Sequence, residues 1–342
     1  MSSIVDVANR ANVSISTVSR VMRGTAHPVN ELTRKRVLDA VKELGYVPSA
    51  LAQALVSRDT HIIGVIVGDA TDPYFANIVR GVEDRARSLG YLVIICNSDR
   101  LPEIELQYLR TLNGYRADGV IFAGGGLTDP EYIGQVRVEL ERLALRGAAI
   151  VTLGQHEFPA ASVTVDNRQI VATAAQHLLE LGHRRIAYIT GPENLTTSRL
   201  RLEGFEMAMA DARIPISQQQ IIPGKYDYES GIRAAQYLVE STEQVTAVLA
   251  SNDLMGVGCI VGLKRAGVRV PEDMSVIGID DIAPALYVDP PLTTVAIPMH
   301  QLGVASMEKV IELLSDESDV PETTIIPHRL VVRNSTGPVP DR

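Results

Sequence analysis

Near the start of the chain, apolar residues recur at the spacing of short amphipathic helices. The segment 4–11 carries them on one face. Asn12 follows it and tolerates the left-handed conformation that ends a helix, while Ser14 can cap a second helix that begins at Ile15. A third helical pattern runs over 30–44. Two short helices joined by about three residues, with a third behind them, predict a helix-turn-helix unit.

Beyond residue 60 the pattern changes to short apolar runs that alternate with helical stretches. Strands buried on both faces have this composition, so the runs predict parallel α/β sheets. The predicted strands are 62–67, 91–96, 118–124, 148–154, 161–166, 185–191, 246–252 and 275–280. Helical patterns lie between most of them, for example at 75–89, 167–181 and 252–266.

The charge distribution separates the same two regions. The whole chain has a formal net charge of −9. Residues 1–60 hold eight Lys and Arg against five Asp and Glu, a net +3, which leaves 24 against 36 in the rest, a net −12. A basic head on an acidic body is typical of a DNA-binding head, although chance sorting of surface charge gives the same asymmetry.

The second predicted helix has the composition of a helix that enters a DNA groove. Its outward positions are small and hydroxyl-bearing, so they do not block a close approach and can bond to phosphates or base edges. Arg20 is long enough to pair with the O6 and N7 atoms of guanine. The alternative is a three-helix cap that touches no DNA.

Three stretches together make a resemblance specific: "VDVANRANVSISTVSRVMRG", "TRKRVLDAVKELGYVPSALAQAL" and "IGVIV…DPYFANIVRGVEDRARSLGY". The chain resembles the LacI/GalR family of repressors from residue 4 to about residue 333. The resemblance implies a hinge helix that folds on DNA as a symmetric pair, with Leu55 wedged into the minor groove. Two departures from the family are Asn12, where Gly is usual, and Gln53, where Arg is frequent.

The resemblance also implies which residues contact the operator. The family's base-reading positions fall on Ile15, Ser16 and Arg20. An apolar Ile15 suits a thymine methyl group, although it can equally face solvent. The full predicted DNA-binding set is Ser14, Ile15, Ser16, Thr17, Ser19, Arg20 and Leu55.

For the body, the resemblance implies two Rossmann-like lobes joined by three crossovers, as in periplasmic sugar-binding proteins. We place the crossovers near 162–166, 292–298 and 324–328. The expected domains are a helix-turn-helix domain (1–48), a hinge helix and linker (49–60), and an effector-binding and dimerisation domain (61–342). Lobe one is expected at about 61–163 plus 297–325, and lobe two at about 164–296 plus 326–342.

Ligands of open α/β sheets bind beyond the carboxyl ends of the strands. Residues at those ends, with the family match, predict an effector site of Asp72, Tyr74, Phe75, Arg201, Tyr226, Asn252, Asp253, Asp280 and Met299. Such carboxylate, amide and guanidinium groups suit sugar hydroxyls, and an aromatic face suits the apolar side of a pyranose. Asn252 and Asp280 can instead merely cap turns or helices. Gly154 stands where some sugar-responsive members have Asp, and Gln155, His156 or Asp72 can substitute.

Other functions find less support in the sequence. The run "AGGGLT" (123–128) lacks the spacing of a phosphate-binding loop and predicts a turn. No metal-ligand spacing, nucleophile and base set or cofactor motif is present, so we expect neither an enzyme nor a cofactor. His183 is expected to be structural, and Cys96 and Cys259 to be buried thiols.

The expected protein is therefore a cytoplasmic, homodimeric repressor that binds a near-palindromic operator and responds to a sugar, with no membrane partner. We see no signal peptide and no spanning segment. A corepressor-dependent regulator of the purine type is the alternative: Thr197 matches a purine-member position, although Leu195 replaces a charged residue there. A solute-binding protein fits the body but not the basic head.

Overall fold

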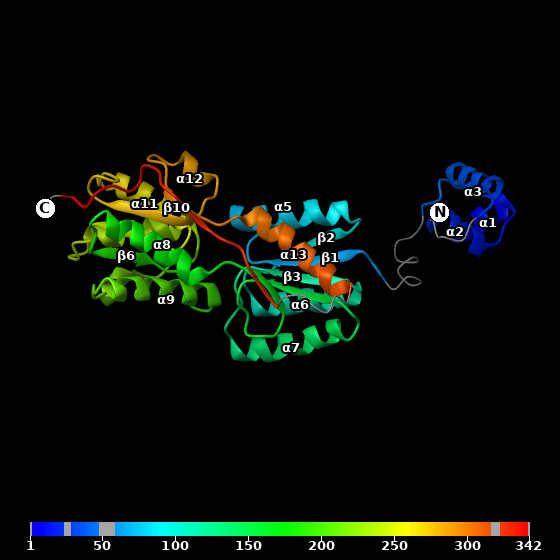
Figure 1. Ribbon diagram of the computed structural model, residues 1–342, viewed down its shortest axis with the longest axis horizontal. Coiled ribbons are helices and arrows are strands. Elements are labelled where there is room, and N and C mark those ends of the chain that lie inside the picture. Colours follow the sequence, from blue (N-terminus) through cyan, green and yellow to red (C-terminus); the bar gives the residue numbers. More distant parts are fainter. Residues whose placement is uncertain (1, 24–28, 48–58, 316–321, 341–342) are drawn as a thin grey trace. The chain divides into compact units, whose positions relative to one another are not determined.

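The computed structural model describes residues 2–23, 29–47, 59–315 and 322–340. The chain divides into two compact units, Met1–Thr60 and His61–Arg342 (Figure 1). Each unit has its own hydrophobic core.

The N-terminal unit contains α1 (Ile4–Ala11), α2 (Ile15–Arg23) and α3 (Glu31–Leu44). Asn12 ends α1 in the left-handed conformation, with φ 50° and ψ 54°. Ser14 Oγ accepts a hydrogen bond of 3.2 Å from the backbone N–H of Thr17 at the start of α2. The predicted end of the first helix and the predicted start of the second are therefore confirmed. The core of this unit contains Val7, Ala8, Ala11, Val18, Val21, Val37 and Ala40.

The first sheet of the large unit is parallel throughout, in the order β11-β5-β4-β3-β1-β2. Its strands are β1 (Ile62–Val67), β2 (Leu92–Asn97), β3 (Gly119–Ala123), β4 (Ala149–Leu153), β5 (Ala161–Thr164) and β11 (Thr323–Ile325). One face is covered by α5 (Pro73–Ser88) and α13 (Met299–Leu314), and the other by α6 (Pro102–Gly114) and α7 (Pro130–Ala144) (Figure 1). We call this sheet and its helices lobe one.

The second sheet has the order β12-β10-β9-β8-β6-β7, and only the β10–β12 pair is antiparallel. Its strands are β6 (Ile186–Ile189), β7 (Ile221–Ile222), β8 (Ala247–Ala250), β9 (Ser275–Asp280), β10 (Thr293–Ala296) and β12 (Arg329–Val331). The helices that belong with it are α8 (Asn167–Glu180), α9 (Thr196–Asp211), α10 (Tyr228–Glu240), α11 (Asp253–Arg265) and α12 (Pro284–Tyr287). We call this sheet and its helices lobe two.

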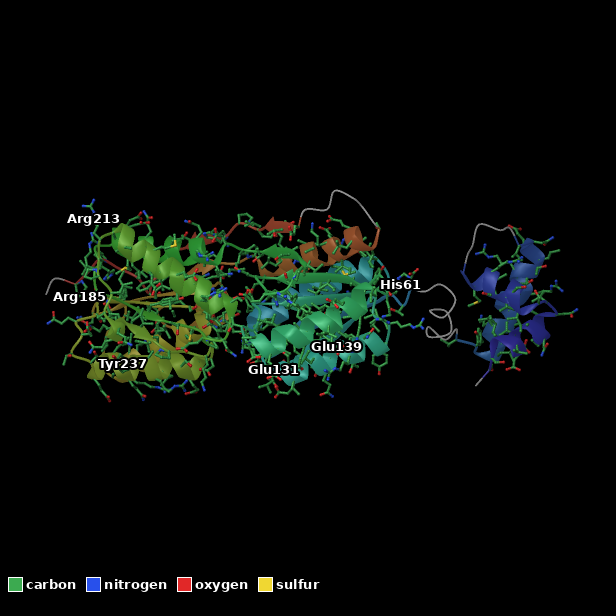
Figure 2. All side chains as sticks on the ribbon, turned by 90° about the horizontal axis from the view of Figure 1, so that it is seen from below. His61, Glu131, Glu139, Arg185, Arg213 and Tyr237 are labelled. Atoms are coloured by element: carbon green, nitrogen blue, oxygen red, sulfur yellow. The ribbon has the colours of Figure 1, made fainter. Side chains whose placement is uncertain are left out.

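The chain passes between the two sheets three times. It leaves the first sheet after β5, returns after β10 through α13, and crosses again between β11 and β12. Figure 2 shows Glu131 and Glu139 on lobe one and Arg185, Arg213 and Tyr237 on lobe two. Each lobe is therefore assembled from segments that lie far apart in the sequence.

All eight predicted strands are present, and four further strands were not predicted. These are β7, β10, β11 and β12, which span two to four residues each. Such short strands carry too little periodicity to be read from the sequence. Three of them, β7, β11 and β12, occupy edges of their sheets, where each pairs with a single neighbouring strand.

His183 is structural, as the sequence predicts. Its ring is completely buried, with Nδ1 2.9 Å from Thr246 Oγ1 and Nε2 3.0 Å from the carbonyl oxygen of Gly337. The imidazole therefore ties the C-terminal segment to lobe two. Burial lowers the pKa of His183 because the charged ring would lose its hydration.

We predict that acidification weakens the contribution of His183 to stability. Since its folded-state pKa is lowered, the unfolded chain binds the proton first, and stability falls as pH drops below about 6.5. Unfolding free energies of the parent and of His183→Gln, measured with denaturant, should differ most at pH 7.5 and less at pH 5. The exposed His61→Gln is the control. A gap between parent and His183→Gln that is constant with pH would contradict the prediction.

Candidate DNA-binding surface and effector cavity

Helix α2 presents its polar residues outward and its valines inward. Val18 and Val21 are buried, whereas Ile15 is 48% exposed and Ser16 and Arg20 are also exposed. Of the remaining predicted contacts, Ser14 is exposed and Thr17 and Ser19 are half-buried. The small side chains at the start of α2 are linked to one another, because Ser14 Oγ lies 2.8 Å from Ser16 Oγ and 2.9 Å from Thr17 Oγ1. The exposed face of α2 is thus formed mostly by short polar side chains, and Arg20 and Ile15 are its longer ones.

Leu55, the predicted minor-groove wedge, lies outside the described residues. The expectation of a hinge helix over this part of the chain stays a prediction.

In the large unit, a cavity lies where strand ends of the two lobes face each other. It encloses about 650 Å³ between its lining atoms, including space open to solvent. Seven of the nine predicted effector residues line it: Asp72, Tyr74, Phe75, Arg201, Tyr226, Asn252 and Asp280. Most of these side chains follow the carboxyl end of a parallel strand, which is the position expected for a ligand site.

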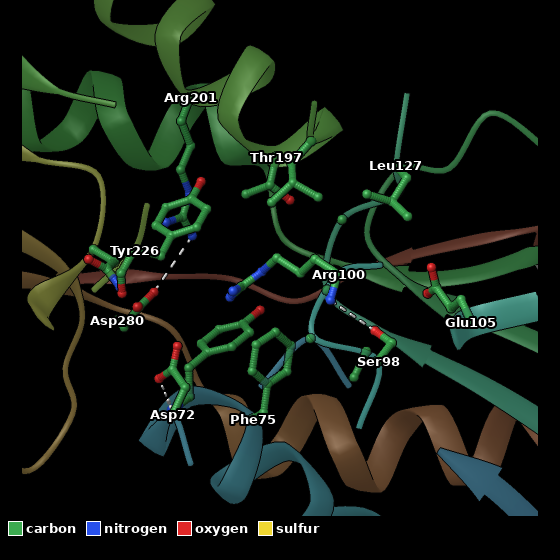
Figure 3. A pocket seen from close by; sticks show the side chains of 17 residues that line it. Asp72, Phe75, Ser98, Arg100, Glu105, Leu127, Thr197, Arg201, Tyr226 and Asp280 are labelled. Atoms are coloured by element: carbon green, nitrogen blue, oxygen red, sulfur yellow. Dashed lines mark hydrogen bonds and ion pairs between the residues drawn. The ribbon is translucent and has the colours of Figure 1, made fainter. Parts of the chain in front are cut away.

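A buried ion pair forms one end of the cavity (Figure 3). Arg201 is 4% exposed, and its Nη2 lies 3.6 Å from Asp280 Oδ1. The guanidinium also donates from Nε to Asn167 Oδ1 at 2.9 Å and from Nη1 to the carbonyl oxygen of Ser251. Arg201 is therefore fixed by three partners, all in lobe two.

Asp280 Oδ1 makes the ion pair with Arg201 at a distance too long for a hydrogen bond. This oxygen is buried and receives no hydrogen bond from the described residues. Burial raises the pKa of Asp280 well above its ordinary value, an effect that Arg201 opposes. A buried acceptor without a donor is costly, so a ligand hydroxyl at this point would satisfy it.

Asp72 and Asn252 contribute to the same end of the cavity while holding helix ends. Asp72 Oδ1 caps α5 by accepting from the N–H of Tyr74 at 2.9 Å. Asn252 Oδ1 caps α11 by accepting from the N–H of Met255 at 3.0 Å, and its Nδ2 donates to the carbonyl oxygen of Tyr226 at 3.0 Å. The capping role that the sequence left open for Asn252 is thus present, at a position that lines the cavity.

Two predicted residues are not among those that line the cavity. Asp253 is completely buried and points away from the cavity lining. Its Oδ1 accepts a hydrogen bond from Thr294 Oγ1 at 2.6 Å, and its Oδ2 accepts one from the N–H of Ile282 at 3.0 Å. Burial raises the pKa of Asp253 to about 7. Met299 is also buried, at the start of α13. Both face the protein interior, since neighbouring elements pack over these strand and helix ends.

Sequence reasoning missed the residues that follow β2. Ser98, Arg100 and Glu105 line the cavity. The Arg100 guanidinium lies 5.7 Å from the centre of the Phe75 ring and 5.9 Å from that of Tyr226, so it covers two aromatic faces. The rule of strand carboxyl ends would have pointed to this segment too, had it been applied to β2.

Glu105 lies on the opposite side of the cavity from Asp280 (Figure 3). It is 9% exposed and shares a hydrogen bond with Tyr132 of α7. Burial raises the pKa of Glu105 to about 7. A carboxyl group that ionises near neutral pH therefore faces the cavity.

Metal and membrane sites find no support in the described parts of the chain. No three His, Cys, Asp or Glu side chains among these residues are arranged to hold a metal ion. None of the described helices is both long and apolar enough to cross a bilayer.

Comparison with known proteins decides the family. Residues 3–49 match the "Bacterial regulatory proteins, lacI family" and residues 175–336 a "Periplasmic binding protein-like domain". The chain is 35% identical over 334 residues to catabolite control protein A of Priestia megaterium, a match that covers 97% of this chain and 98% of the relative. The chain belongs to the LacI family. It is also 36% identical over 336 residues to the transcriptional repressor PurR of Photobacterium profundum, covering 98% of both chains.

Solved structures of similar regulators agree. A lac repressor dimer bound to operator and the anti-inducer ONPF matches with a TM-score of 0.87 and 27% identity, covering 98% of this chain and 99% of that one. The regulator CelR in complex with cellobiose matches with a TM-score of 0.72 and 30% identity, covering 98% and 100%. The predicted fold class is confirmed. The protein is a DNA-binding transcriptional regulator with a ligand-binding domain and, like these relatives, not an enzyme.

We predict that Glu105→Gln is more stabilising, relative to the parent, at pH 8 than at pH 5. The folded-state pKa of Glu105 is raised from 4.5 to about 7, so the folded parent gains stability as it takes up a proton below pH 7. The glutamine variant lacks this gain, and the difference between the two pH values should reach about 3 kcal/mol at most. Denaturant unfolding at both pH values measures it, with the exposed Glu103→Gln on the same helix as control. Parallel pH curves for parent and Glu105→Gln would refute the assignment.

Proposed function

We propose that this LacI-family regulator is a cytoplasmic, homodimeric repressor that binds a near-palindromic operator and responds to a sugar held between its two lobes. The observation that carries the proposal is the cavity itself. Its lining combines the buried Arg201–Asp280 pair, the amide of Asn252 and the aromatic ring of Tyr226.

The DNA-binding half of the proposal rests on the shape and chemistry of α2. Arg20 and Ile15 extend from a surface of small hydroxyl side chains, while Val18 and Val21 fix the helix to its own core. Hydroxyl groups and backbone N–H groups at such a helix end bond to phosphates, and a longer Arg reads base edges. Two copies of this unit on adjacent half-sites would match a two-fold symmetric operator.

The sugar half rests on the polarity of the cavity. Asp280 offers an unsatisfied acceptor, and Arg201 and Arg100 offer donors, which suits ligands whose hydroxyl groups both donate and accept. The bound cellobiose of CelR gives a precedent in a structure of the same fold. A purine is the alternative ligand that the sequence left open, and Thr197 does line the cavity. Leu195 beside it is apolar and gives a purine ring no charged partner.

Regulation requires that the ligand distinguish two states of the protein. A sugar that contacts both lobes binds one interlobe arrangement better than another, and operator affinity shifts only by that difference. Couplings of this kind are typically about 1–3 kcal/mol. Whether the ligand releases or recruits DNA binding follows from which arrangement it prefers.

We predict that Arg20→Ala weakens operator binding by about 1–3 kcal/mol, because one bidentate base contact is lost. Operator affinity is measured at constant salt by fluorescence anisotropy. The labelled duplex carries the operator sequence that footprinting has located. Arg213→Ala, an exposed residue of lobe two, is the control and should bind as the parent does. An Arg20→Ala variant that binds as tightly as the parent would refute the proposed reading surface.

We predict that Arg201→Ala keeps operator affinity and loses the response to ligand. A thermal-shift screen of sugars, sugar phosphates and purines first identifies a ligand, and operator binding is then measured with and without it. Glu206→Ala is the matched control, because Glu206 lies on the same helix but is exposed and does not line the cavity. If Arg201→Ala proves unstable, Asp280→Asn tests the same end of the cavity. A full ligand response in a folded variant of either residue would overturn the site.

A further inference from the structure

Two loops from different lobes pair directly with each other beside the cavity. The first, 124–128, follows β3 in lobe one, and the second, 194–197, leads into α9 in lobe two. The N–H of Thr128 donates to the carbonyl oxygen of Asn194 at 3.0 Å, and the N–H of Thr196 donates to that of Gly126 at 2.9 Å. Leu127 and Leu195 thereby face each other in an antiparallel bridge. We call the residues 124–128 and 194–197 the interlobe latch.

A single hydroxyl group extends the latch to a third segment. Thr196 is completely buried, and its Oγ1 accepts from the N–H of Gly126 at 2.9 Å and donates to the carbonyl oxygen of Gln155 at 2.6 Å. Gln155 follows β4 of lobe one. Thr196 therefore links the first turn of α9 to two loops of the other lobe at once.

Two glycines of the first loop are required by close packing, and Gly125 is the one that meets the other lobe. Gly125 does not have a positive φ, so its backbone alone would accept another residue. A Cβ there, however, would lie 2.9 Å from the backbone nitrogen of Thr197 and 3.0 Å from Thr196 Oγ1. A Cβ on Gly126 would lie 2.8 Å from Nδ1 of His156, which follows β4 in the same lobe. Gly125 thus allows backbone from the other lobe to pack directly on the loop, and Gly126 allows the loop to pack on its own lobe.

The latch joins cavity-lining segments of the two lobes. Helix α9 begins at Thr196 and carries Thr197 and Arg201, which both line the cavity, as do Leu127 and Leu195. Moving the first turn of α9 away from lobe one would separate these groups from those that follow β1 and β2. The contact is made by backbone and hydroxyl groups, so it is present before any ligand adds its own contacts.

We propose that Gly125, Gly126 and Thr196 are positioning residues, which hold the two lobes together on this side of the cavity and present Thr197 and Arg201 to the effector. The proposal rests on the proposed function in one respect only, the role of the cavity as the effector site. Without the latch contacts the lobes separate here and sample wider arrangements.

The test measures the separation of the lobes directly in the full chain, without ligand or operator. Spin labels are attached at Glu131→Cys on α7 and Tyr237→Cys on α10, two surface positions on different lobes (Figure 2). The native Cys96 and Cys259 are only 2% and 0% exposed, so they are shielded from the reagent. Pulsed dipolar spectroscopy then gives the distribution of interlobe distances.

We predict that Gly125→Val shifts this distribution to longer distances and broadens it, since a branched side chain cannot fit against Thr197. Gly134→Ala is the matched control: it adds a methyl group to a helix of the same lobe with nothing within 4 Å, and should leave the distribution unchanged. A folded Gly125→Val protein whose distribution coincides with that of the parent would overturn the proposal.

Thr196 provides a second variant pair in case Gly125→Val does not fold. Thr196→Val keeps the side-chain shape but removes the hydroxyl, and should lengthen the interlobe distance, whereas Thr196→Ser restores the hydroxyl and should return it to the parent value. Equal distributions for Thr196→Val and Thr196→Ser would contradict the role of this hydroxyl group. The effector proposal is judged separately, by whether a ligand from the screen alters operator binding in the parent.

Discussion

The cost of burying charge organises the large unit of this regulator. Arg201 and Asp280 are both nearly inaccessible to water, and such a pair is stable only when its remaining donors and acceptors find partners. Asn167 and the carbonyl of Ser251 satisfy Arg201, but one oxygen of Asp280 receives no hydrogen bond from the described residues. The protein thus holds a fixed cation beside an oxygen without a hydrogen bond, an arrangement that a polar ligand would complete.

The same constraint explains why the cavity lies between lobes. Polar side chains at strand ends would be buried without partners inside one lobe, whereas a cleft gives them access to solvent or to a ligand. Several of them also cap helices, as Asp72 and Asn252 do, so their orientation is fixed before a ligand arrives. These side chains therefore lose little conformational freedom when a ligand binds, which favours both the affinity and the selectivity for that ligand.

Regulation of the LacI type then needs an interlobe arrangement that a ligand can bias. The latch and the cavity lie side by side, because Leu127 and Leu195 belong to both. Backbone contacts of this kind are short-ranged and are either made or broken, so they define discrete arrangements rather than a continuum. A ligand that favours one arrangement can therefore change the state of the whole unit through modest differences in contact.

Local sequence determined the helix-turn-helix unit and the alternation of strands and helices. The signals are local: Asn12 in the left-handed conformation, the capping Ser14 and apolar residues at helical spacing. They act within a few residues of each other, so they can be recognised from the sequence alone. Strand ends, together with the family resemblance that pointed to Arg201 and Tyr226, predicted seven residues of the cavity. Tertiary structure alone decided that Asp253 and Met299 face the interior, that Arg100 and Glu105 reach the cavity, and that a glycine run meets α9 of the other lobe. Those outcomes depend on which distant segments approach one another, and the spacing of residues along a chain does not encode the direction of a side chain relative to a remote neighbour.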